Sequence, residues 1–195
     1  MFFSHASQLN IFFLDMNPQM CAFAHCDDHI HEMIPVYSQI LSNAHHILDP
    51  EGEITEHIKP LDPGFPNVQM EVQVAWTKDA ESNYQWLHDL WFWMNKEYWY
   101  RFDGMHDDWN TLYNKLSHTP QNIPDSNFTS PPPLVPEEFK ETKLEDDLQN
   151  TIAGYRNFYR WWVDNNDCEW SAPEGATRTA PDWIIREEET IDANV

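Results

Sequence analysis

The chain has 195 residues, with 33 acidic and 11 basic side chains that give a formal net charge of −22. This charge excludes an open-faced nucleic-acid binder and disfavours duplex nucleic acid as a partner, because it repels phosphate backbones. Hydrophobic residues make up 41% of the chain and include 10 Trp, which excludes intrinsic disorder. A chain of this length can bury an apolar core unaided, so we expect one globular domain over residues 1–195.

Cysteine usage and the apolar segments indicate a soluble protein of a reducing compartment. Cys21, Cys26 and Cys168 form no CxxC pair, so neither a disulfide framework nor a cysteine zinc site is expected. Residues 1–16 have no basic region and no small-residue cleavage site, unlike a secretory signal. No uninterrupted apolar stretch approaches the about 18 residues that a membrane span requires. We therefore expect a cytoplasmic protein with no membrane partner.

In the first half of the chain, hydrophobic spacing predicts one long helix. After a short apolar run at residues 9–14, residues 18–48 contain no glycine and place apolar side chains three or four residues apart. Pro35 could kink or break this helix. Residues 49–67 carry four prolines and two glycines and are expected to form a surface loop. Apolar and polar side chains alternate over residues 68–76, a pattern that is also compatible with one isolated strand.

The second half is expected to hold the centre of the fold. Residues 79–102 carry Trp, Tyr and Leu around most of a helical circumference, which is typical of a central helix. A shorter helix is predicted over residues 107–116, with two acids at its positive end. Residues 117–136 form a proline-rich connector, and a last helix should run from beyond residue 136 to about residue 164. The fold class is therefore mainly α: a single-domain helical bundle with a central aromatic-rich helix and at most one short strand or hairpin.

Histidine placement suggests the first candidate site. All ten histidines precede residue 119, and His25, His29 and Glu32 follow one another at helical spacing on one face. Two imidazoles and a carboxylate suit iron, manganese or zinc with open positions for water. Two alternatives remain open at this stage. The histidines could be surface or core-edge groups, or His29 could act as an acid–base catalyst with Asp28 or another carboxylate.

Cations are scarce, so their positions are informative. Arg101 follows the central aromatic segment, and Arg156 and Arg160 lie one turn apart in the aromatic segment 155–162. Guanidinium groups beside Tyr and Trp can pair with phosphate and stack on bases. The alternative is that these arginines neutralise buried carboxylates such as Glu97.

Short patterns along the whole chain carry a family resemblance. They are Leu14-Asp15, Cys26 to His29, Gln39 to His45, Asn83-Tyr84, Trp86-Leu87, Glu97-Tyr98, Arg101, His106, Val135 to Lys140, Tyr155-Arg156, Tyr159 and Pro181 to Trp183. Together they resemble a family of unknown function encoded by tailed bacteriophages, notably marine ones. The resemblance implies a viral protein that acts in the host cytoplasm. Relatives tend to carry lysine at the position of Glu32, which weakens Glu32 as a metal ligand.

Two main functions follow as hypotheses. The first is a small phage-encoded enzyme that acts on a phosphate-bearing nucleotide or nucleobase, with His29, Arg101 and Arg156 as catalytic residues. It would work with or without a divalent metal (Fe, Mn or Zn) held by His25, His29 and Glu32. The second is a non-catalytic acidic protein that binds a basic protein partner, for instance by imitating the charge of nucleic acid. A duplex-binding repair enzyme is disfavoured by the charge.

Overall fold

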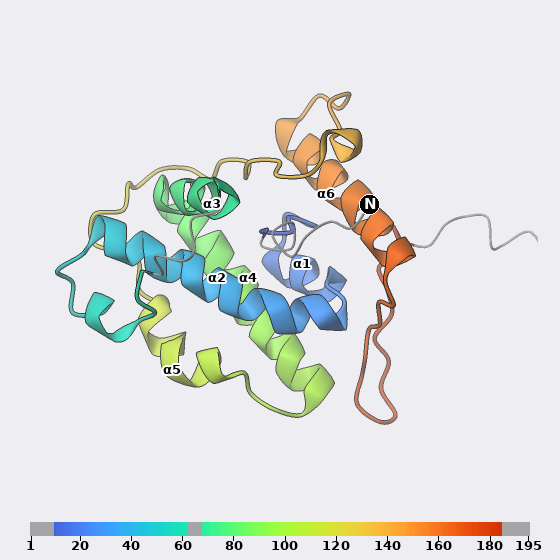
Figure 1. The fold of residues 1–195 in the computed structure, drawn as a ribbon, viewed down its shortest axis with the longest axis horizontal. Helices are drawn as coiled ribbons and strands as arrows, with labels where there is room; N and C mark the ends of the chain where they lie inside the picture. Colours follow the sequence, from blue (N-terminus) through green and yellow to red (C-terminus); the bar gives the residue numbers. More distant parts are fainter. Residues whose placement is uncertain (1–9, 62–67, 185–195) are drawn as a thin grey trace, which may run out of the picture.

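The computed structural model describes residues 10–61 and 68–184, and within these ranges it is helical, with no strand (Figure 1). This confirms the predicted mainly α bundle. The α-helices and two short 3₁₀ helices are α1 (Pro18–Ala24), α2 (Asp27–Leu48), η2 (Thr55–His57), α3 (Val68–Lys78), α4 (Glu81–Phe102), α5 (Asp107–Leu116), η3 (Glu137–Phe139) and α6 (Asp147–Asn165). None of the helices in the described ranges is long and apolar enough to cross a membrane.

Helix α4 is the centre of the bundle, as its aromatic circumference predicts. It packs against α1, α2, α3 and α5, and α2 crosses it in Figure 1. Its inward side chains include Trp91, which is fully buried, and Trp86, which packs against Phe13. Because neighbours cover α4 on several sides, a helix with little amphipathic contrast is stable here. The predicted helix over residues 107–116 is confirmed as α5.

The predicted single helix over residues 18–48 is two helices in the structure. The chain is extended at His25 and Cys26, between α1 and α2. Pro35, the predicted break, lies inside an uninterrupted α2. A proline costs an inner helical hydrogen bond, but every residue of α2 from Val36 to His45 is buried, and that packing holds the helix together. The break is set by contacts from other parts of the chain, which are described below.

The strand considered for residues 68–76 is absent, and helix α3 occupies this segment. Met70 and Val74 face the core one turn apart, as a helix requires. The helical period is hidden in the sequence because Gln73 and Thr77 are buried too. Gln73 donates from Nε2 to Oδ1 of Asn10 at 2.6 Å, and Thr77 donates to the backbone of its own helix. Polar groups with such partners can lie in a core.

The connector at residues 117–136 has no helix, and it leads through η3 to α6 at the edge of the bundle (Figure 1). Gly154 lies against η3, where an added Cβ would be in ordinary contact with the Phe139 carbonyl oxygen, at 3.4 Å. The next residue of α6, Tyr155, donates from its hydroxyl to Oδ1 of Asn10 at 3.0 Å. The C-terminal segment then returns to the bundle, where Trp170 donates to the Ala24 carbonyl at 3.3 Å.

His45, near the end of α2, is a buried histidine held in its neutral form. Its Nε2 lies 2.9 Å from the Tyr84 hydroxyl, which donates its own proton to the Leu116 carbonyl at 3.0 Å. We therefore assign the imidazole proton to Nε2 of His45. Burial lowers the pKa of His45 to about 4, because the charged imidazole would lose its hydration.

This burial predicts a pH-dependent stability. The folded pKa lies below the unfolded value of 6.5, so the unfolded chain binds more protons as the pH falls. The contribution is complete above about pH 6.5 and is lost towards pH 4, by about 2 kcal/mol between pH 7 and pH 5. Urea unfolding at both pH values should show this loss reduced in His45→Gln. The exposed His57→Gln variant should keep it, and equal losses in both variants would refute the assignment.

Candidate functional site

His29 lies in the protein interior. Its Nδ1 lies 2.8 Å from the Tyr159 hydroxyl, which also accepts a hydrogen bond from the backbone N–H of Cys26 at 2.8 Å. The imidazole stacks on Phe12, at 4.6 Å between ring centres, and lies against Trp162. Its Nε2 is buried and has no hydrogen-bond partner among the described residues. This geometry makes His29 a part of the contact between α2 and α6.

The structure does not bring His25, His29 and Glu32 together as a metal site. Nδ1 of His25 donates to the Cys21 carbonyl at 2.7 Å, and Nε2 accepts from the Tyr37 hydroxyl at 3.4 Å. Glu32 is exposed, whereas both histidines are fully buried. The shared face was predicted for one helix, and the break places His25 outside α2. Within the described ranges, no three His, Cys, Asp or Glu side chains gather closely enough for a metal ion.

Arg101 is a buried structural residue at the break between α1 and α2. Its guanidinium donates twice to Glu97 Oε2, at 2.8 and 2.9 Å, and once to the His25 carbonyl at 2.8 Å. It also donates to Asp27 at 3.1 Å and to the Phe23 carbonyl at 3.4 Å. The interpretation that this arginine neutralises Glu97 is therefore confirmed. Its side chain is fully buried and lines none of the three hollows described below.

Arg156 and Arg160 are half-buried, and the guanidinium groups of both lie against the ring of Trp183. Arg156 donates to the Leu14 carbonyl at 2.7 Å and to Asp15 at 3.0 Å, and its guanidinium lies 5.1 Å from the Trp183 ring centre. Arg160 donates to the Trp183 carbonyl at 2.6 Å and also lies against this ring. The predicted association of arginine with aromatic side chains is thus present, and Arg156 lines a hollow.

Two neighbouring hollows lie between α1, α4 and the C-terminal segment. The first, the arginine hollow, has a volume of about 360 Å³, and its walls include Arg156 and Trp183. The second, the aromatic hollow, has a volume of about 790 Å³, and its walls include Trp93, Trp99 and Tyr100. Phe23 and Arg178 line both, so the two hollows adjoin.

Arg178, which the sequence analysis did not single out, lies between these hollows. It donates to Glu97 Oε1 at 2.7 Å and stacks over the rings of Phe23 and Tyr100 at 4.4 and 4.8 Å. Its Nε is buried without a hydrogen-bond acceptor in the described part of the chain. The only signal in the sequence is the rarity of arginine, because its partners come from distant segments.

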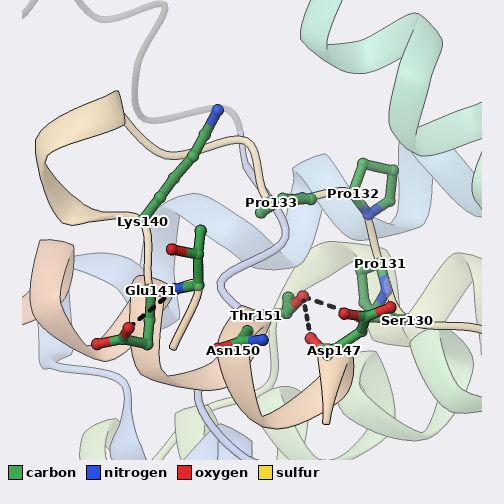
Figure 2. A pocket seen from close by; sticks show the side chains of 11 residues that line it. Ser130, Pro131, Pro132, Pro133, Lys140, Glu141, Asp147, Asn150 and Thr151 are labelled. Atoms are coloured by element: carbon green, nitrogen blue, oxygen red, sulfur yellow. Dashed lines mark hydrogen bonds between the residues drawn. The ribbon is translucent and has the colours of Figure 1, made fainter. Parts of the chain in front are cut away.

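A third hollow, of about 390 Å³, lies between the proline-rich connector and the start of α6 (Figure 2). Its polar side chains bond to one another and to the backbone: Ser130 to Thr151 at 2.9 Å, and Thr151 to the Asp147 carbonyl at 3.0 Å. Figure 2 shows Lys140 pointing away from these groups. This hollow is a seam between two elements of the fold.

A comparison of the chain with protein-family models, with curated proteins and with solved structures finds no match.

We predict that Arg101→Met strongly destabilises the fold. It would leave buried Glu97 with Arg178 as its remaining cation and leave the carbonyls at the break unpaired, at a cost of about 3–5 kcal/mol. Arg101→Lys should lose less stability, because the lysine ammonium can make some of the hydrogen bonds that the guanidinium group makes. Urea unfolding measures both. The exposed Lys143→Met should show no measurable change, and an Arg101→Met variant as stable as this control would contradict the structural role.

Proposed function

We propose that this protein binds a nucleotide or a similar ligand that joins a phosphate to a planar base. The phosphate would lie in the arginine hollow and the base in the adjoining aromatic hollow. This proposal keeps the ligand class expected from the sequence and moves the site from His29 to the surface around Arg156 and Arg178.

The observation that carries the proposal is the position of Arg178 on the walls of both hollows. Its side chain is partly exposed, so its guanidinium can donate to a ligand oxygen there. Arg156 also lines the arginine hollow, so two guanidinium groups can face one anion. Charge-assisted hydrogen bonds of this kind are the usual way in which arginine holds phosphate. The hollow holds two of the chain's 11 cations, Arg156 and Arg178, beside two of its 33 acids, Asp15 and Asp182.

The aromatic hollow supplies surfaces for a base. Trp93, Trp99 and Tyr100 line it, and the side chain of Trp99 is 52% exposed. Stacking of one base on an aromatic side chain contributes about 1–3 kcal/mol and tolerates any base. Lys96, whose ammonium lies 5.7 Å from the Trp99 ring centre, adds a cation at this wall.

The geometry supports binding at this surface better than catalysis by His29. His29 is fully buried and is not among the residues that line either hollow. A general acid or base must come within hydrogen-bond reach of its substrate. Arg101 contributes indirectly, since it holds Glu97, which in turn holds Arg178.

A second candidate is the acidic interaction protein that binds a basic partner. It is favoured by the carboxylates of Asp103 and Glu174 at the aromatic hollow, both of which are exposed. A lysine or arginine of a partner could stack on Trp99 and pair with these acids. In either case, the resemblance to phage proteins suggests that the ligand or partner would be met in the host cytoplasm.

The test is isothermal titration of the wild-type protein with AMP, ATP and inorganic phosphate at about 0.1 M salt. Arg178→Gln should weaken nucleotide binding about 10- to 100-fold, because a charged hydrogen bond is lost. Lys143→Gln removes the same charge from a remote exposed site and should leave binding nearly unchanged.

The same titrations separate the two candidates. Hexa-arginine is the probe for a basic partner, and the double variant Asp103→Asn with Glu174→Gln should weaken its binding but not that of nucleotides. Asn suits the left-handed backbone at residue 103, where φ is 50°. Nucleotide binding that is unaltered by Arg178→Gln would refute the first candidate. Binding of hexa-arginine alone, lost in the double variant, would establish the second.

A further inference from the structure

Cys26 and Cys168 come together where the C-terminal segment docks onto the break between α1 and α2. The backbone N–H of Asp27 donates to the Glu169 carbonyl at 2.9 Å, so the residues that follow the two cysteines are hydrogen-bonded. Two residues further on, the Ser171 N–H donates to both carboxylate oxygens of Asp27, at 3.0 and 3.1 Å. These bonds hold together two segments that are far apart in sequence.

The two thiols are neighbours, and both cysteines are free. Cys26 is fully buried and Cys168 half-buried. We propose that this pair is a redox site, at which a peroxide converts the two thiols into a reversible Cys26–Cys168 disulfide. Such a pair remains reduced in a reducing cytoplasm and closes under oxidative stress.

The surroundings make Cys26 the attacking sulfur. The Cys168 thiol, together with the neighbouring imidazole of His29, lowers the pKa of Cys26 below its usual range. Cys26 in turn raises the pKa of Cys168, which keeps its proton. The third cysteine differs, because burial raises the pKa of Cys21 to about 12 and its thiol bonds to the Phe12 carbonyl. Thiolates react with peroxide and thiols do not, so Cys21 should remain unreacted.

The reaction balances as a two-electron oxidation. The Cys26 thiolate attacks one oxygen of hydrogen peroxide, the O–O bond breaks, and hydroxide leaves and takes up a proton as water. Cys26 is then a sulfenic acid. The Cys168 sulfur attacks it, the S–S bond forms, and the sulfenic oxygen leaves with the Cys168 proton as a second water. Each sulfur has given up one electron, and the peroxide has been reduced to water.

The disulfide would fix the start of the C-terminal segment to α2. Pro173 and Arg178, a few residues further along, line the aromatic hollow. Oxidation would therefore secure one wall of that hollow. The redox proposal does not depend on the proposed nucleotide binding, because Cys26 and Cys168 line neither hollow.

The test treats the reduced full-length protein with hydrogen peroxide, blocks the remaining thiols by alkylation, and maps peptides by mass spectrometry without reduction. We expect a Cys26–Cys168 crosslink within one chain, reversed by dithiothreitol, with Cys21 alkylated. Cys21→Ser should form the same crosslink. Cys168→Ser should form none and should leave a Cys26 sulfenic acid that dimedone traps.

Circular dichroism of each variant shows whether it is folded, and Cys168→Ala serves as a second variant if the serine is not tolerated. The expected crosslink should be lost when the reaction is run in urea, which separates the two segments. Oxidation of Cys21 at the rate of Cys26, or crosslinks only between chains, would overturn the proposal. So would a crosslink that persists unchanged in urea.

Discussion

The arrangement of this bundle depends on the hydrogen bonds that the buried guanidinium group of Arg101 makes. This group binds Glu97 within α4, the end of α1 and the start of α2. A buried charge is tolerated only when its hydrogen bonds are satisfied, and here the free carbonyls at the helix break provide acceptors. Glu97 extends the network to Arg178. The same contacts that stabilise the break therefore position the arginine that lies between the two surface hollows.

Three buried histidines also hold parts of the fold together. Each contacts the hydroxyl group of a tyrosine that belongs to another helix. The three pairs are His25 with Tyr37, His29 with Tyr159 and His45 with Tyr84. A neutral imidazole can donate from one nitrogen and accept at the other, so it can join two elements inside a core at a lower cost than a charged group. Three of the ten histidines thus serve packing between helices.

The surface distributes its charges unequally. Acidic side chains lie exposed over much of the described surface, whereas several of the few cations already contact carboxylates, as in Lys59 with Asp108 and Arg156 with Asp15. An anionic ligand would be repelled by most of this surface. In the arginine hollow, Arg156 and Arg178 balance Asp15 and Asp182, so an anion would meet no excess of acidic side chains there.

Local periodicity by itself determined the helical class, the central aromatic helix and the bounds of α5, because each rests on neighbours within a few turns. It also singled out Arg156 for its aromatic neighbours in the sequence, whereas the ring that this guanidinium lies against is that of the distant Trp183. Only the tertiary structure decided the break at His25, since Arg101 and the C-terminal segment stabilise it from far along the chain. The helical state of α3 likewise depends on Asn10, which satisfies a polar core residue. Arg178 gained its role from Glu97 and Phe23, and long-range partners of this kind leave no local pattern in a sequence.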